Sequence, residues 1–492
     1  MQRALRHAPA FLALGFAAAT AGCELRDISD SLNPPPPEPG LLTGSITQNR
    51  ILFADTVYTL RGYVKVQNGV TLTIQAGTKI VGDTNTLGSS LWILRGAKIN
   101  AQGTLAKPIV FTSARAPGQR RRGDWGGIII IGRGVINRTG ATILTEGSAA
   151  GQSENYAGGT DNNDNSGVMR YVRIEFAGFD ISNGGGQELN SLSMYAVGRG
   201  TTLEYIQALH GLDDSFEWWG GAVDGRYLVS YESGDDHFDW TEGYQGRNQF
   251  LIALQTIFAA TIPGVGQGST DPRGFEGDGC DPAQAGCTVV NLTAGTDVAG
   301  ASGPYSMPVF ANFTIIGPGL GVAGFPADGN GAVLRRATAG GFTNGIIGRW
   351  PGRGIQMRDA FTDSLRLRDS LKIINVILVE NGPAATPTNY DAVGADGGAA
   401  TEANRRFAQA AKFANSNHRE VATVASLIKS LNTGSLDWTA TGAATTGGGQ
   451  LSLPAARIAN FFGGTMVNTT YVGAADPAGP KWWEGWTVYV PN

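Results

Sequence analysis

Two short stretches of the chain share one pattern, GLDDSFEWWGG at residues 211–221 and GDDHFDWTEG at residues 234–243. A shift of 22 residues superposes the double aspartate, the phenylalanine, the following acid, the tryptophan and a glycine. The same shift aligns LEYIQAL with RYLVSYE and then NQFLIAL, and it places Tyr227 and Leu228 over Gln249 and Phe250. A repeat this short is one supersecondary unit, not a duplicated domain.

The contents of the repeat indicate its architecture. Short runs rich in β-branched and aromatic residues are separated by Gly, Asn and Asp, and no helix-length amphipathic pattern interrupts them before about residue 400. This excludes helical solenoids, and a propeller blade needs about 40–45 residues. A coil of three short strands and three turns fits the observed period. The sequence therefore predicts an all-β fold, a right-handed parallel β-helix over residues 41–385, with a small α-helical segment near the C-terminus.

Composition limits the classes of partner. The chain has 492 residues, of which 72 are glycine, and glycine readily takes the positive φ of tight turns. The net charge of -4 gives no basic footprint, so nucleic acid is excluded as a partner. The stretch GLGVAG from Gly319 fits a dinucleotide fingerprint, but a proline follows where that fold requires a helix. No nucleotide cofactor is expected.

The first residues have the features of a targeting signal. An apolar run over residues 8–20 follows two arginines and ends in small residues directly before Cys23. This arrangement resembles the bacterial lipobox, which implies a signal peptide over residues 1–22 and acylation of Cys23. A proline-rich tether over residues 23–40 would hold the body off the membrane. We expect a lipid-anchored outer-membrane protein, on the cell surface or the periplasmic face; an ordinary secretory signal is the alternative.

Two further cysteines, Cys280 and Cys287 in GCDPAQAGC, are close enough in sequence to close a small loop. Disulfides persist in exported proteins. The sequence therefore predicts a Cys280–Cys287 disulfide.

Four stretches of the chain resemble a set of bacterial cell-surface lipoproteins with predicted parallel β-helix bodies: DNNDNSGVMRYVRIEFAG, LHGLDDSFEWWGG, SGDDHFDWTEGYQGRNQF and WWEGWTVYV. The resemblance covers roughly residues 45 to 380 and the final segment. Most known members have no assigned activity, so the resemblance implies fold and location more than chemistry.

Stacked coils would place equivalent side chains about 4.8 Å apart. Phe216 would then lie over Phe238, and Trp218 over Trp240, as favourable aromatic pairs. Stacked carboxylates repel one another by about 1 to 3 kcal/mol per pair, depending on the local dielectric. Three such pairs need compensation: Asp213 with Asp235, Asp214 with Asp236, and Glu217 with Asp239.

Four kinds of compensation are open at this point. The carboxylates can be solvated or accept backbone N–H groups in turns, or Arg226 and Arg247 can neutralise them. They can bind Ca²⁺, which prefers hard oxygen ligands; the candidate ligands are Asp213, Asp214, Glu217, Asp235, Asp236 and Asp239, with a weaker calcium candidate at Asp161 and Asp164. They can also act in polysaccharide cleavage, for which the candidate residues are Asp214, Glu217, Asp236, Asp239 and His210.

Strand alternation assigns these side chains to faces. Phe216 should point inward, while Glu217, Asp239 and His237 should lie on the surface. Trp219 and Trp240 can stack on sugar rings or serve as core and rim aromatics. The histidines outside the signal, His210, His237 and His418, are too scattered for a transition-metal site.

Residues 386–492 differ from the body in composition and in the spacing of their apolar residues. The segment TEANRRFAQAAKFANSNHREVATVASLIKSLN predicts two short amphipathic helices, with one apolar face formed by Val421, Val424, Ile428 and Leu431. We expect these helices to cap the open end of the β-helix; a partner-binding hairpin is the alternative. The final KWWEGWTVYVPN predicts a strand returning to the body.

Together these observations predict a surface lipoprotein whose β-helix acts as a binding or adhesion module. The expected partner is a polysaccharide or a surface protein, and calcium is the expected stabilising ion. The alternative is a polysaccharide hydrolase or lyase that uses the stacked carboxylates.

Overall fold

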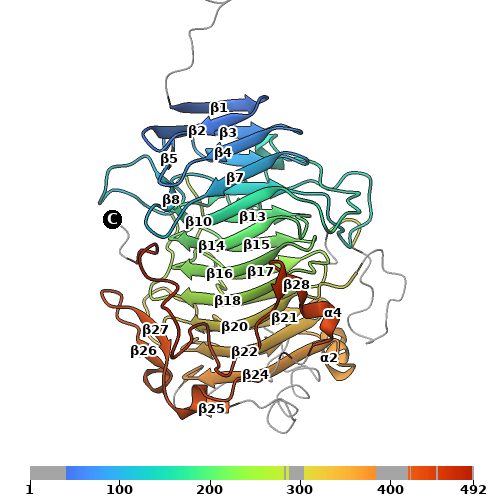
Figure 1. Cartoon of the computed structure of the whole chain (residues 1–492), viewed down its shortest axis with the longest axis vertical. Helices are drawn as coiled ribbons and strands as arrows, with labels where there is room; N and C mark the ends of the chain where they lie inside the picture. Colours follow the sequence, from blue (N-terminus) through green and yellow to red (C-terminus); the bar gives the residue numbers. More distant parts are fainter. Residues whose placement is uncertain are drawn as a thin grey trace, which may run out of the picture. The chain divides into compact units, whose positions relative to one another are not determined.

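Parallel strands stacked in register form the body of the protein (Figure 1). The computed structural model describes residues 40–281, 284–287, 304–383, 419–421, 423–449, 451 and 453–489. The predicted signal peptide, Cys23, the tether up to Pro39, and His418 lie outside the described residues. None of the helices in the described ranges has the length and apolar character needed to cross a bilayer.

Each central coil contributes one short and one long strand. The short strands are β9 (Ile128–Ile131), β13 (Leu192–Tyr195), β15 (Phe216–Trp219), β17 (Phe238–Thr241), β19 (Phe275–Asp278), β21 (Ala332–Arg335) and β23 (Ile355–Met357). The long strands are β10 (Gly167–Glu175), β14 (Thr202–Leu209), β16 (Asp224–Tyr231), β18 (Arg247–Leu254), β20 (Val309–Ile316), β22 (Gly340–Gly348) and β24 (Leu371–Val379). Each pairs in parallel with its equivalent in the next coil. The predicted parallel β-helix is confirmed.

The first coils are built in the same way from shorter pieces. They contain β1 (Leu41–Ile46), β2 (Arg50–Leu52), β3 (Val57–Val66), β4 (Thr71–Ile74), β5 (Lys79–Gly82), β6 (Ser90–Ile93), β7 (Lys98–Gln102) and β8 (Ile109–Ser113). Two small antiparallel strands, β11 (Phe179–Asp180) and β12 (Glu188–Leu189), belong to a loop of a central coil.

The predicted columns of side chains are present. Phe216 is opposite Phe238 and Trp218 is opposite Trp240 in the parallel register of β15 and β17. The phenylalanine column continues to Phe275, with ring centroids 5.5 Å apart at both steps. These rings are fully buried. Burial of stacked aromatic side chains is a large share of what holds successive coils together.

The 22-residue shift is wrong for one pair of long strands. Arg226 is opposite Gln249 and Leu228 is opposite Leu251, so this coil has one residue more than the repeat predicts. As a result Tyr227 stacks on Phe250 instead of lying over Gln249. The extra residue falls between β17 and β18, where a turn can accommodate it.

Every central long strand bends sharply at one residue with positive φ. Four of these residues are aromatic, and three are asparagines in later coils: Tyr171, Tyr205, Tyr227, Phe250, Asn312, Asn344 and Asn375. A left-handed backbone is strained for a residue with a side chain. Stacking of the rings compensates, since the centroids of Tyr205 and Tyr227 are 4.4 Å apart and the planes differ by 12°. We call Tyr171, Tyr205, Tyr227 and Phe250 the aromatic ladder.

The C-terminal part differs from the prediction. Of the segment expected to form two helices, residues 401–418 lie outside the described residues, and the remainder contains β25 (Arg419–Val421), a 3-10 turn at Val424–Ser426, and β26 (Ile428–Ser430). β25 pairs with β24 and so covers the edge of the last coil, which is the task expected of the helices. The final residues 481–489 form turns and not a strand.

The remaining elements are short. β26 pairs with β27 (Asp437–Ala440), and β28 (Ala459–Phe461) pairs with β29 (Gly464–Thr465). The two α-helices in the described residues are α2 (Ala360–Leu367), which the sequence did not predict, and α4 (Ala455–Ile458). The C-terminal apolar residues Trp438, Val472 and Trp486 pack against outward apolar residues of the long strands, including Val229 and Ile252. This segment therefore covers one side of the coils.

Candidate functional site

Three carboxylates occupy equivalent outward positions on successive short strands. Glu217 on β15 is opposite Asp239 on β17, and Asp239 is opposite Glu276 on β19. The flanking coils place Ser193 and Val333 at the same position. The column is therefore acidic over three coils only, where neighbouring strands are about 4.8 Å apart.

The double aspartates extend this column into a larger cluster. Carboxylate oxygens lie within 4.8 Å of one another in each of three groups: Asp213 with Asp214 and Asp235, Asp214 with Glu217 and Asp239, and Asp236 with Asp239 and Glu276. We call these seven residues the acidic ladder. The three groups are contiguous because Asp214 and Asp239 each belong to two of them.

Sequence reasoning identified six members of the acidic ladder and missed Glu276. The signal was present in GFEGDG, where Phe275 and Glu276 continue the phenylalanine and acid columns. A long loop between β18 and β19 interrupts the period and hides this third copy.

Some carboxylates of the acidic ladder accept hydrogen bonds from backbone amides or from a side chain. Asp214 Oδ1 accepts a hydrogen bond from the amide of Asp236 (2.8 Å), and Asp236 Oδ1 accepts one from the amide of Arg273 (2.6 Å). Glu217 Oε2 accepts a hydrogen bond from the side chain of Asn190. In contrast, Asp235 Oδ1 and Asp239 Oδ1 are shielded from solvent and accept no hydrogen bond from any part of the chain that the structure describes.

The two arginines predicted to neutralise the ladder lie elsewhere. Arg226 pairs with Glu204, and Arg247 pairs with Asp224 through Nε at 2.9 Å. Both belong to long strands, whereas the acidic ladder belongs to the short strands. The prediction of Arg226 and Arg247 as partners was therefore wrong.

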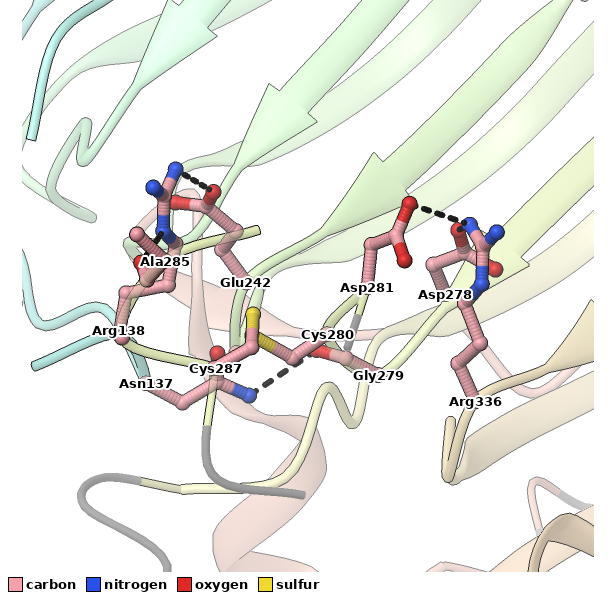
Figure 2. The surroundings of a disulfide bond; sticks show 12 residues. Asn137, Arg138, Glu242, Asp278, Gly279, Cys280, Asp281, Ala285, Cys287 and Arg336 are labelled. Carbon is pink, nitrogen blue, oxygen red and sulfur yellow. Dashed lines mark hydrogen bonds and ion pairs between the residues drawn. A yellow bond between two sulfur atoms is a disulfide. The ribbon is translucent and has the colours of Figure 1, made fainter. Parts of the chain in front are cut away.

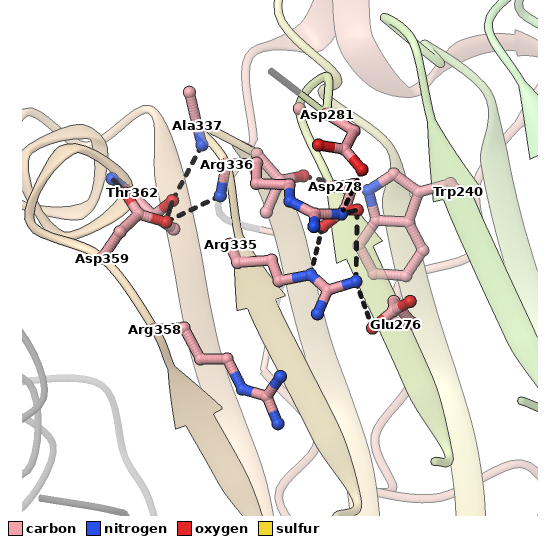
Figure 3. Close-up of polar contacts among 12 residues, drawn as sticks. Trp240, Glu276, Asp278, Asp281, Arg335, Arg336, Ala337, Arg358, Asp359 and Thr362 are labelled. Atoms are coloured by element: carbon pink, nitrogen blue, oxygen red, sulfur yellow. Dashed lines mark hydrogen bonds and ion pairs between the residues drawn. The ribbon is translucent and has the colours of Figure 1, made fainter. Parts of the chain in front are cut away.

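Two cations that contact the ladder are Arg273 and Arg335. Arg273 is buried and contacts Asp236 (3.5 Å), Asp271 and Glu276. Arg335 on β21 lies between Glu276 (2.9 Å) and Asp278 (2.7 Å), as Figure 3 shows. Both cations lie toward the Glu276 end, so Asp213, Asp214 and Glu217 have less compensation than the other members.

The pKa shifts of the carboxyl groups differ along the acidic ladder in the same way. Burial, and then neighbouring carboxylates, raise the pKa of Asp213, Asp214, Glu217, Asp236 and Asp239 well above the ordinary values. Burial also raises the pKa of Asp235, to about 6, although Arg273 opposes the shift. For Glu276 burial acts in the same direction, but Arg273 and Arg335 outweigh it and its pKa lies below the ordinary value.

These shifts predict an unusual pH dependence of stability. Two further carboxyls, Glu146 and Glu188, lie close enough to Asp213 to raise its pKa. Burial and Glu188 raise the pKa of Glu146 to about 8, and burial with Asp180 raises the pKa of Glu188 to about 7. A carboxyl whose pKa is raised by folding stabilises the fold at low pH, and this stabilisation is lost as pH rises through the folded pKa. With a metal chelator present, the melting temperature should therefore rise as pH is lowered from about 8 to about 5. A melting temperature that falls steadily over this range in differential scanning fluorimetry would contradict the electrostatic account.

Two residues that were predicted to lie on the surface, Glu217 and His237, are buried. The side chain of Glu217 points outward from β15, yet the residue is only 6% exposed. His237 is buried and contacts Ser230 through Nδ1. The alternation rule assigned the direction of Glu217 correctly, but loops cover the strand, so the prediction of Glu217 and His237 as surface residues was wrong.

His210 lies at a corner of its coil, where its φ is positive, and is not part of the acidic ladder. It lines a cavity of about 300 Å³ together with Phe176, Arg120, Arg121 and Arg122. Burial, and then Arg122, lower the pKa of His210 to about 3, so the imidazole is neutral at physiological pH. Within the described residues, His210 has no carboxylate partner of the kind that an acid–base pair requires.

The two tryptophans proposed for sugar stacking have different surroundings. Trp240 is fully buried against Phe310, and its Nε1 donates to Thr338 (2.9 Å), so its proposed role in stacking was wrong. Trp219 is half-buried and stacks on Tyr195 at 5.5 Å. A ligand-stacking role for Trp219 stays a prediction.

The second calcium candidate has an ordinary turn structure. Asp161 Oδ1 accepts from the amide of Asn163 (2.9 Å), and Asp164 Oδ2 accepts from the amide of Arg133 (3.0 Å). Neither aspartate belongs to a group of converging acidic ligands within the described residues. Calcium binding by Asp161 and Asp164 stays a prediction.

The predicted disulfide is present. Cys280 and Cys287 are bonded, with Cα atoms 5.8 Å apart, directly after the acidic strand β19 (Figure 2). Asn137 donates to the carbonyl oxygen of Gly279 (3.0 Å), and Arg138 donates to that of Ala285 (3.0 Å). The bond and these contacts fasten the loop that follows Glu276.

A protein-family model described as a pectate-lyase-like beta helix domain matches residues 44–439 of the chain. No curated protein and no solved structure matches the chain.

Proposed function

Because the chain belongs to the family of pectate-lyase-like β-helix domains, we propose that it is a polysaccharide-binding module whose acidic ladder holds calcium. Calcium would in turn bind an acidic polysaccharide. The observation that carries the proposal is the convergence of seven carboxylates in three contiguous groups, each of which contains a buried oxygen that accepts no hydrogen bond from the described residues.

The donor set of the acidic ladder fits calcium. All seven side chains offer carboxylate oxygens, which are the hard ligands that Ca²⁺ prefers. Neither cysteine nor histidine takes part, which disfavours zinc. A bound divalent cation would supply the positive charge that Asp213 and Asp214 lack, since Arg273 and Arg335 lie toward the other end.

An acidic polymer is favoured for two reasons. Calcium that protein carboxylates hold can complete its coordination with the carboxylates of a ligand. The cavity lined by Arg120, Arg121 and Arg122 also lies close to the double aspartate, because Arg122 donates to the carbonyl oxygen of Gly211 (2.7 Å). A cavity with basic residues therefore lies near the start of the double-aspartate turn, which suits a ligand that carries anionic groups along its length.

Calcium-dependent binding of hexagalacturonate tests this proposal. Isothermal titration calorimetry should detect binding in millimolar calcium and none in excess chelator. Asp239→Asn should weaken binding at least tenfold, because Asp239 belongs to two of the three groups. The matched control is Asp55→Asn, an exposed aspartate in another turn, which should bind as the unmodified protein does. Equal affinity in calcium and chelator, or no effect of Asp239→Asn, would contradict the proposal.

Polysaccharide cleavage is the second candidate function. Asp239 and Glu276 are opposite each other on adjacent coils, and their pKa values move in opposite directions. Burial and Glu276 raise the pKa of Asp239 and so favour its protonated form, whereas the arginines lower the pKa of Glu276 and favour its ionised form, as an acid and base pair requires. New reducing ends or unsaturated products in the hexagalacturonate mixture, lost in Glu276→Gln, would assign cleavage to this pair.

We also propose that the module is carried on the outer membrane by an acylated Cys23. The small residues before Cys23 and the proline-rich stretch after it support this location.

A further inference from the structure

A second cavity lies at the aromatic ladder, on strands that do not carry the acidic ladder. It has a volume of about 380 Å³, within the range of small-molecule sites. Tyr205, Tyr227 and Phe250 form one wall, and residues 467–471, Asp476, Pro480 and Trp482 form the other. The C-terminal segment therefore forms one side of a hollow at the bend of three successive coils.

The aromatic ladder contributes three stacked rings to the lining of this cavity, and two of them carry hydroxyl groups. Tyr205 stacks on Tyr171 at 4.4 Å and on Tyr227 at 4.4 Å, and Tyr227 stacks on Phe250 at 5.0 Å. The planes differ by 9° to 12°, so the neighbouring rings cover the faces of Tyr205 and Tyr227. Because cation–π attraction requires an open ring face, these two rings do not form a cage for an organic cation.

The charge of the lining excludes an anionic ligand. Asp476 is the only charged residue among the described residues that line the cavity. Hydroxyl and amide groups come from Tyr205, Tyr227, Asn468 and other members of the lining, so the cavity offers many hydrogen-bond donors and acceptors beside apolar walls. Such a combination suits an uncharged ligand that carries several hydroxyl groups.

We propose that this cavity is a second saccharide site, which binds an uncharged sugar residue independently of calcium. This proposal takes only the class of ligand, a saccharide, from the proposed function. The cavity itself is independent of that function, because none of its residues belongs to the acidic ladder. A polysaccharide with both uronic acid and neutral residues could engage the two sites with different parts of its chain.

Titration with uncharged hexasaccharides of glucose, mannose and xylose tests this site. Binding is followed by calorimetry and by the fluorescence of tryptophan, because Trp482 lines the cavity. At least one hexasaccharide should bind equally in calcium and in chelator. The double variant Tyr205→Phe/Tyr227→Phe keeps the stacked rings but removes two hydroxyls, and it should weaken binding about fivefold to tenfold.

Tyr171→Phe is the matched control, since Tyr171 belongs to the same ladder but does not line the cavity. It should bind the hexasaccharide as the unmodified protein does. The assignment is overturned if no uncharged hexasaccharide binds, if the double variant binds unchanged, or if choline binds instead. Failure of hexagalacturonate to bind in calcium, with hexasaccharide binding intact in chelator, would remove the function proposed for the acidic ladder and leave this site in place.

Discussion

Replacing Arg273 with methionine is expected to lower the free energy of unfolding of the calcium-free protein by about 3–5 kcal/mol. The Arg273 side chain is 3% exposed and contacts Asp236, Asp271 and Glu276. Methionine retains the backbone amide that donates to Asp236 but leaves these carboxylates without their buried cation. Chemical denaturation in chelator measures the loss.

Calcium should recover part of the stability of this variant, because a divalent cation replaces positive charge beside Asp236 and Glu276. Arg61→Met is the control. Its partner is Asp83, and the Arg61 side chain is 50% exposed, so this change should cost under about 1 kcal/mol. A loss for Arg273→Met no larger than that of the control would show that the acidic ladder does not depend on this cation.

The repeat of the sequence predicted most of the fold because stacked coils impose a direct physical correspondence. Residues one coil apart become neighbours, so Phe216 and Phe238 had to match in kind as well as in spacing. The same reasoning failed at Phe250, where one extra turn residue shifted the register while the aromatic ladder stayed intact. The type of side chain therefore depends on its position within the coil and not on a constant spacing of 22 residues in the sequence.

Prediction of the candidate site was less complete, since burial and partners depend on loops. Glu276 follows a loop of irregular length, and Arg273 at the end of that loop contacts Asp236, 37 residues earlier. Nothing in the local sequence assigns such a partner. Arg226 and Arg247 seemed suitable by spacing, but they lie on another face of the coil, where Glu204 and Asp224 bind them.

The C-terminal segment shows the limit of periodicity. Val421, Val424 and Ile428 fit one face of a helix by spacing, yet they belong to β25, a 3-10 turn and β26. The exposed edge of β24 offers backbone hydrogen bonds that β25 takes up. The outward apolar residues of the long strands, such as Val229 and Ile252, are then covered by irregular chain.

Calcium is expected to stabilise the unmodified protein strongly. In the absence of metal, burial and mutual repulsion raise the pKa values of carboxyl groups in the acidic ladder. Holding these groups together therefore lowers the stability of the metal-free fold. A ligand at one hundred times its Kd adds about 2.7 kcal/mol to the stability of a fold that alone binds it. Asp239→Asn should remove most of this gain, because it takes an oxygen ligand from two of the three groups.

Thermal unfolding during a calcium titration therefore tests the central claim most directly. At neutral pH the melting temperature should rise through micromolar to millimolar calcium and reach a plateau, while Asp239→Asn should show little rise and Asp55→Asn should behave as the unmodified protein. A melting temperature that does not change up to millimolar calcium, or that rises equally in Asp239→Asn, would contradict the assignment of calcium to the acidic ladder.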